Sequence, residues 1–245
     1  MHFFFSSIFV PCALAIGVMV MLEFGRKVGL WRIQRGNEST SSGAIENAVF
    51  AIFGLLVAFT FSGAASRFDD RRALITQEAN DIGTAWLRLD LLPTDHQANL
   101  RNDFRQYLDA RLAAYRSGHD LDHAKALLAE ADRLQGQIWS GAIAGCRADG
   151  TPPTTTLVLP ALNAMFDIAT TRLMATRAHP PTILFALLIA LSLICAFLAG
   201  NGLAVEKPNR LHAIGFSLVI AFTVYVILDM EYPRLGFIRV DAADQ

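Results

Sequence analysis

The sequence predicts an all-α membrane protein in which four transmembrane helices form two hairpins, with a helical extramembrane domain between them. The first observation is four long apolar stretches, which are Phe3–Leu22, Ala48–Ser66, Pro181–Gly200 and Leu211–Met230. Each is long enough to cross a bilayer core, which takes roughly 20 apolar residues as a helix. The second observation is the polar middle of the chain, where apolar residues recur every three or four positions, as they do in helices. Because lipid offers no partner to a bare backbone, each span should be a closed helix.

These observations divide the chain into three segments. Residues 1–66 form the first transmembrane hairpin, 67–180 the helical extramembrane domain, and 181–245 the second hairpin with a C-terminal tail. An even number of spans puts both termini and the helical domain on the same side of the membrane. Basic residues near the span ends divide almost evenly between the two sides, so the positive-inside rule selects no orientation.

The first span is expected to be retained as a membrane helix. A signal peptide is the alternative, but this apolar run is longer than the apolar region of a typical signal. No Lys or Arg precedes it, and no small-residue cleavage pattern follows it before Glu23. We therefore count it as the first of four spans.

The second span is expected to leave the membrane without a break. No Pro or Gly lies between Gly63 and Gly83, so one helix should continue until Pro93 ends it. Thr94 should then cap the next helix, with Gln97 as the partner in a capping box.

Three more helices should complete the extramembrane domain. They are expected to run from Thr94 to about Arg116, from Asp120 or Asp122 to about Ile143, and from about Thr155 to Ala178. The residues from Gly145 to Pro153 are rich in turn formers and predict a break between the last two helices.

The second span also carries the candidate pore residues. Phe53, Val57 and Phe61 stand at positions i, i+4 and i+8, which places them on one helix face. Identical copies around an axis would stack these side chains into an apolar neck, and such constrictions can gate ions by dewetting. The simpler explanation, which the spacing alone favours, is contact with lipid or neighbouring helices. Another face carries small residues that would let a second backbone approach closely, namely Gly54, Ala58, Ser62 and Ala65.

Charged residues cluster where the second span ends. The run contains Arg67, Asp69, Asp70, Arg71 and Arg72. Basic side chains at a pore mouth would concentrate anions. Alternatively, these are ordinary surface charges that pair along the helix, and the residues alone favour this second explanation.

The end of the fourth span and the start of the second carry further candidates. Asp229 and Glu231 lie near the expected membrane boundary, where an ionisable group suggests a functional role. Alternatively, these acids pair with Arg234 or with the arginines after the second span, and so tie the two hairpins together. Glu46 and Asn47 could line a vestibule, although an acid at a helix N-terminus is also favoured by the helix dipole.

No feature of the chain predicts an enzyme, a cofactor or a metal site. A formal net charge of −1 gives no reason to expect nucleic-acid binding, and the three cysteines have no metal-binding spacing. His119 and His123 flank two aspartates and could bind a metal, but Asp120 more simply begins a helix there. Phosphate-binding, hydrolase and metalloprotease motifs are missing from the sequence.

The chain resembles the bestrophin-like domain family, a bacterial family of four-span membrane proteins. The resemblance rests on Ile45-Glu46-Asn47, on the aromatic and small residues of Phe50–Ser66, on the exit Phe68-Asp69-Asp70-Arg71-Arg72, and on Glu78-Ala79. It covers nearly the whole chain and implies two spans, a helical insert and two more spans. It also implies a bacterial inner membrane.

A more distant resemblance is to the bestrophins, which are pentameric anion channels with the same order of spans. It implies a homo-oligomer that is permeable to ions such as chloride, in which Phe53, Val57 and Phe61 form the neck. Arg71-Arg72 replace the aromatic pair that follows the bestrophin exit, and the calcium-binding acidic cluster has no counterpart. The alternative function is a non-conducting membrane sensor or scaffold whose helical domain binds a partner or lipid. An intramembrane enzyme is disfavoured, because clustered polar residues at mid-membrane depth are missing.

Overall fold

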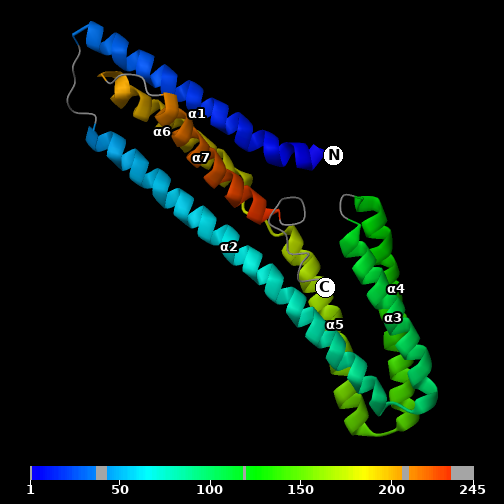
Figure 1. Cartoon of the computed structure of the whole chain (residues 1–245). Helices are drawn as coiled ribbons and strands as arrows, with labels where there is room; N and C mark the ends of the chain where they lie inside the picture. Colours follow the sequence, from blue (N-terminus) through cyan, green and yellow to red (C-terminus); the bar gives the residue numbers. More distant parts are fainter. Residues whose placement is uncertain (1, 37–42, 118–119, 206–209, 233–245) are drawn as a thin grey trace. The chain divides into compact units, whose positions relative to one another are not determined.

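The computed structural model describes residues 2–36, 43–117, 120–205 and 210–232. In this part of the chain 94% of the residues are helical and none is in a strand, which confirms the all-α fold. The α-helices in chain order are α1 (His2–Gln34), α2 (Gly43–Arg88), α3 (Thr94–Arg116), α4 (Leu121–Asp149), α5 (Pro152–Arg177), α6 (Thr182–Gly202) and α7 (Arg210–Glu231) (Figure 1).

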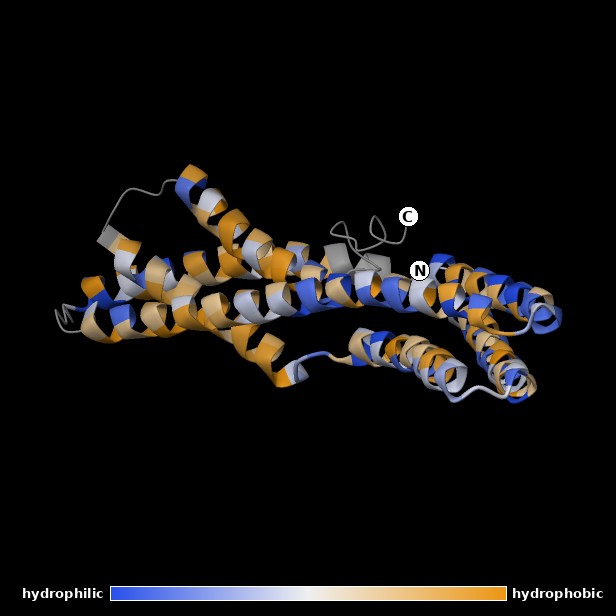
Figure 2. Cartoon of the chain, turned by 90° about the horizontal axis from the view of Figure 1, so that it is seen from below, coloured by the Kyte–Doolittle hydropathy of each residue, from blue (hydrophilic) through white to orange (hydrophobic). Residues whose placement is uncertain are grey.

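Within the described residues, four segments are long and apolar enough to cross a membrane, as predicted. They are Phe9–Gln34, Gly43–Leu91, Pro152–Gly202 and Arg210–Glu231. Colouring by hydropathy shows their apolar stretches as orange ribbon, whereas polar and apolar residues alternate in α3 and α4 (Figure 2). The chain is therefore a multi-pass membrane protein.

The chain forms two compact units. The membrane unit comprises, among the described residues, 2–36, 43–68, 179–205 and 210–232. The insert unit comprises residues 69–117 and 120–178. Helix α2 contributes its first part to the membrane unit and its last part to the insert unit.

In the membrane unit, α1 packs against both α6 and α7. A Cβ atom at Gly25 would collide with the carbonyl oxygen of Phe197, and one at Gly200 would collide with that of Leu22. The backbones of α1 and α6 therefore touch, which small residues permit between membrane helices. This contact also explains why α1 continues past Leu22, the expected end of the first span, to Gln34.

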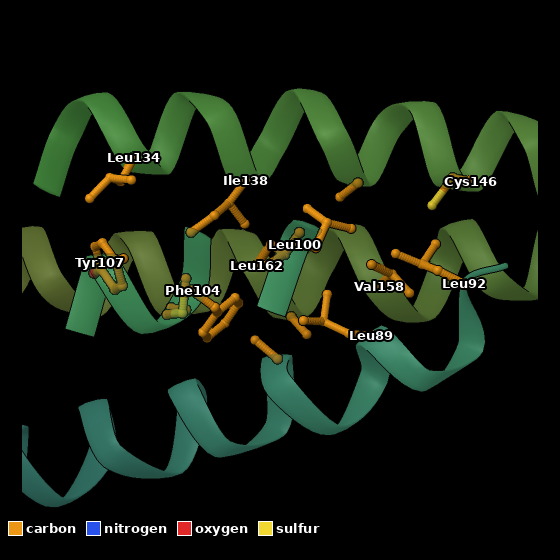
Figure 3. Close-up of a cluster of buried hydrophobic side chains, with 14 of the residues drawn as sticks. Leu89, Leu92, Leu100, Phe104, Tyr107, Leu134, Ile138, Cys146, Val158 and Leu162 are labelled. Carbon is orange, nitrogen blue, oxygen red and sulfur yellow. The ribbon is translucent and has the colours of Figure 1, made fainter. Parts of the chain in front are cut away.

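In the insert unit, α3, α4 and α5 pack around one apolar core together with the end of α2. Phe104, Tyr107, Leu134, Ile138 and Leu162 lie within it and are each 1% exposed or less (Figure 3). Edge-on aromatic contacts run through this core, joining Trp86 to Phe104, Phe104 to Tyr107, Tyr107 to Phe166, and Phe166 to Trp139. Such pairs add about 0.5–1.5 kcal/mol each beyond the area they bury.

The turn between α2 and α3 differs from the expected capping box. Helix α2 ends at Arg88 and a single 3₁₀ turn, Leu89–Leu91, follows it. The cap position of α3 is Pro93, and Thr94 is already helical, so the predicted Thr94 cap is wrong. The Gln97 amide instead donates to the carbonyl oxygen of Leu92 at 2.8 Å, and the backbone of Leu92 is extended.

The boundaries of α4 and α5 also differ in part from the expectation. Asp120 caps α4 by accepting a hydrogen bond from the His123 backbone N–H at 3.0 Å. The predicted break at Gly145 is wrong, because a Cβ there would lie 3.2 Å from the Leu92 side chain and the residue serves close packing inside α4. The helix ends instead at Gly150, whose φ of 69° suits glycine.

Candidate functional site

The predicted pore residues of α2 do not share one environment within a single chain. Phe53 and Val57 are half-buried and pack against the apolar core of the membrane unit. Phe61 is 45% exposed. Each step of four residues turns a helix by about 40° beyond a full rotation, so the line of three side chains drifts around the helix.

Much of α2 is uncovered. Only 6% of its most apolar window is buried, against 28% for each of the other three spanning segments. The predicted small-residue face takes part in this exposure, because Gly54, Ala58 and Ser62 are exposed and Ala65 is half-buried. Among the described residues nothing lies within 4 Å of a Cβ placed at Gly54. This face is therefore open to another helix.

At the end of the α2 span, Arg67 meets the last residue of α7. Its Nε lies 2.9 and 3.1 Å from the two carboxylate oxygens of Glu231, and its Nη2 lies 2.8 Å from Oε2. The Glu231 side chain is fully buried. A two-pronged contact of this kind fixes the geometry as well as supplying energy, so the pair holds α2 and α7 together.

His179 is a third member of this group, and no pattern in the sequence indicates it. Its Nδ1 lies 3.2 Å from Glu231 Oε1, and its ring stacks on Tyr232 with centroids 4.6 Å apart. A lone histidine between Ala178 and Pro180 has no motif around it, so only the tertiary contact distinguishes it.

Asp229, the other predicted acid of α7, is 3% exposed. It accepts a hydrogen bond from the Tyr225 hydroxyl at 3.2 Å, one turn earlier on the same helix. Arg234 lies outside the described residues. Of these two acids near the end of α7, Glu231 contacts Arg67 of α2 and Asp229 contacts Tyr225 of its own helix.

The charged residues after Arg67 differ in their exposure to solvent. Asp69, Asp70 and Arg72 are exposed, whereas Arg71 is 6% exposed. Arg71 donates hydrogen bonds to the carbonyl oxygen of Ala175 at 3.2 Å and to that of Ala178 at 3.0 Å. A cation at the carbonyl end of a helix is electrostatically favourable, so this arginine stabilises the end of α5.

The predicted vestibule residues lie in the first turns of α2. Glu46 is half-buried and Asn47 is exposed. An acid in the first turn of a helix complements the partial positive charge there, and this explains Glu46 without a further partner.

The insert unit contains a buried ionic cluster that the sequence analysis missed. Glu78 accepts from Arg111 Nη2 at 2.5 Å and from Arg172 Nη1 at 2.6 Å. Tyr115 lies beside both arginines, with its hydroxyl 2.5 Å from Arg111 Nη2 and its ring 3.8 Å below the Arg172 guanidinium. Burial lowers the pKa of Arg111, but the fields of Tyr115 and Glu78 outweigh it and raise that pKa overall. The cluster therefore holds fixed positive charge.

A possible signal for this cluster is the position of charged residues on otherwise apolar helix faces. Glu78 lies one turn after the buried Ile75 on α2, and Arg111 follows the buried Ala110 on α3. Charged residues are rarely fully buried unless they are paired. Among the described residues, no group of three or more His, Cys, Asp or Glu side chains is placed to hold a metal.

The family described as Bestrophin-like domain matches residues 12–244. The match covers most of the chain, including the neck residues, the charged run after α2 and the end of α7. No curated protein and no solved structure matches the chain.

Proposed function

The chain belongs to the bestrophin-like domain family, and from that membership we propose that it is an oligomeric ion channel. The proposed ion is an anion such as chloride, and the proposed assembly is a homo-oligomer, with the pentamer as the first candidate. We place it in a bacterial inner membrane, with α2 lining the pore. The neck in this proposal is formed by Phe53, Val57 and Phe61.

The observation that carries the proposal is the exposure of α2. The other spanning segments bury 28% of their most apolar windows within one chain, and α2 buries 6%. A helix with an exposed face of small residues is suited to close approach by a second helix. Copies of the chain arranged around an axis would cover α2 and give it a central position.

Charged and polar residues are exposed at the two ends of the spanning part of α2. Asp69, Asp70 and Arg72 are exposed just beyond the span, and Asn47 is exposed at its start. In an oligomer each of these positions would be repeated around the axis. A ring of basic side chains attracts anions and a ring of acids repels them, so the ring of Arg72 would favour the entry of anions and the two rings of aspartate would oppose it.

The test is anion flux from liposomes that contain the purified protein, with Phe61→Ala compared with Phe59→Ala. Both phenylalanines are exposed on α2, at 45% and 68%. They lie two residues apart, or about 200° around the helix. The same substitution is therefore made on opposite sides of one helix.

We expect wild-type flux and a change of severalfold in Phe61→Ala, because a neck that loses its aromatic ring is wider and wetter. Phe59→Ala should conduct like the wild type. A change in Phe59→Ala alone would place the pore on the other side of α2. No flux from protein that is folded and oligomeric would reject the channel.

One observation favours the second function, a non-conducting membrane sensor or scaffold. Phe53 and Val57 already pack against the core of their own chain, which leaves them less available to a pore. In that case the insert unit would bind a partner or lipid, and Phe61→Ala would change stability but not flux.

A further inference from the structure

The membrane unit contains a cavity of about 150 Å³ to which the proposed channel assigns no role. It lies among α2, α6, α7 and Pro180, which is two residues before α6. Its walls are mainly apolar and include Leu56, Phe59, Leu184, Phe185 and Ile227. All of the residues that line it belong to the membrane unit.

The size and position of the cavity suit part of a hydrocarbon chain. A dry apolar cavity of about 150 Å³ accommodates a benzene-sized group, so this one takes roughly a six-carbon segment. Phe59, one of its walls, is 68% exposed. Because the walls come from spanning helices, acyl chains of the bilayer surround this surface.

One wall of the cavity is a cation. Arg67 holds Glu231 through hydrogen bonds from Nε and an ion pair from Nη2, and these are its polar contacts within the described part of the chain. A Cβ placed at Gly63, which lines the cavity, would lie 3.3 Å from Arg67 Nη1. The Nη1 group therefore lies along the cavity wall with its N–H donors available, and 32% of the Arg67 side chain is exposed.

We propose that this cavity binds a glycerophospholipid of the surrounding bilayer. One acyl chain lies along the apolar walls between α2 and α6, and a phosphate oxygen accepts a hydrogen bond from Arg67 Nη1. Glu231 offsets much of the charge of Arg67, so the contact is a directed hydrogen bond to phosphate, a group that arginine recognises well. A phospholipid fits better than a second copy of the chain, because it supplies the acceptor and the hydrocarbon in one molecule.

The lipid would fill the space between α2 and the helices α6 and α7. A ligand that binds the folded state stabilises it by mass action. The occupied cavity would then support α2, which is the least buried of the spanning segments within one chain.

The test is native mass spectrometry of the purified protein after incubation with phosphatidylglycerol or with diacylglycerol of the same acyl chains. The two molecules differ by the phosphate headgroup. We expect the wild type to retain one phosphatidylglycerol per protomer, at least 10-fold more than diacylglycerol. Equal retention of the two would overturn the role of Arg67.

A matched pair of substitutions locates the site. Gly63→Leu fills the cavity beside Arg67, whereas Gly215→Leu makes the same change on α7 of the same unit, where nothing lies within 4 Å. We expect retention to fall at least 10-fold in Gly63→Leu and to stay unchanged in Gly215→Leu. Equal retention in the two variants would overturn the proposal.

A second pair keeps the test decisive if Gly63→Leu misfolds. Leu184→Trp fills the cavity from α6, and Leu187→Trp, at a position that is 46% exposed and off the wall, is its control. Loss of lipid in Leu184→Trp alone supports the proposal. Disulfide cross-linking between copies that carry Thr60→Cys in this cavity would overturn it, because a second chain would then occupy the site.

Discussion

The two units each bury one glutamate against arginine, but the surroundings of the two glutamates differ. In the membrane unit, Glu231 faces one arginine, Arg67, whose side chain is 32% exposed, and a histidine. In the insert unit, Glu78 lies between Arg111 and Arg172, whose side chains are 6% and 10% exposed. In the first group Arg67 is partly exposed although Glu231 is fully buried, whereas all three side chains of the second group are enclosed.

The same pair of residue types can therefore contribute unequally to the free energy of unfolding. Loss of one partner from an enclosed cluster leaves a charge without water, which costs about 3–5 kcal/mol. Where the remaining charge is partly exposed, as that of Arg67 is, loss of its partner costs less, because water can solvate that charge. Four predictions follow this comparison in order of expected effect.

The largest effect is expected for Glu78→Ala. The substitution removes the carboxylate between two buried arginines and should lower the free energy of unfolding of the insert unit by about 3–5 kcal/mol. Urea unfolding followed by the fluorescence of Trp86 and Trp139 measures it, in a Trp31→Phe background. Glu130→Gln, which breaks an exposed pair with Arg133, is the control and should leave the free energy of unfolding nearly unchanged. Similar losses in both would contradict the enclosure of Glu78.

The next effect concerns the contact of α1 with α6. Gly200→Val would push a side chain into the backbone of Leu22, so the helices must separate, at a cost of about 3 kcal/mol. Gly202→Val meets nothing within 4 Å and should be nearly neutral. Size-exclusion chromatography after heating in detergent compares the two, and equal thermal stability would show that the helices do not touch at Gly200.

A smaller effect is expected for the Arg67–Glu231 pair. A double-mutant cycle with Arg67→Gln and Glu231→Gln should give a coupling energy of about 2 kcal/mol. Each single substitution already breaks the charged hydrogen bond, so the second substitution cannot break it again. Thermal unfolding of all four proteins in detergent measures it. A coupling near zero would mean that the pair does not hold α2 to α7.

The smallest effect is a dependence of stability on pH at the junction of α4 and α5. The Thr151 side chain lowers the pKa of Asp149 from its ordinary value of 3.8 by donating a hydrogen bond. A carboxyl whose pKa is lower in the folded state adds stability above its unfolded pKa, and that stability is lost as the pH falls through the folded value. Asp149→Asn should therefore lower the urea midpoint slightly at pH 6 and leave it unchanged near pH 2. A difference that persists at low pH would exclude this carboxylate as the cause.

Much of the fold was predictable because its signals are local. Four apolar stretches of sufficient length are written in consecutive residues, and Pro93 and Asp120 mark helix boundaries within a few positions. Gly145 misled the prediction, because a glycine that ends a helix and one that permits close packing look alike in sequence. Its contact with Leu92 depends on the turn between α2 and α3, which is more than fifty residues earlier.

The candidate site was predictable as residue types but not as contacts. The acids near the end of the fourth span and the arginines after the second were both candidates, and several pairings were open. The structure selects Arg67 with Glu231, which are 164 residues apart, and adds His179. It also shows that Phe53 and Phe61, which share a predicted face, have different surroundings.

By itself the sequence determined that the chain is helical and crosses a membrane, because hydrophobic length and helical periodicity are properties of neighbouring residues. The tertiary structure decided which charges meet, where glycine brings two backbones together, and where a cavity opens beside Arg67. These features join residues far apart in the chain. Their positions depend on how whole helices pack, which no local pattern specifies.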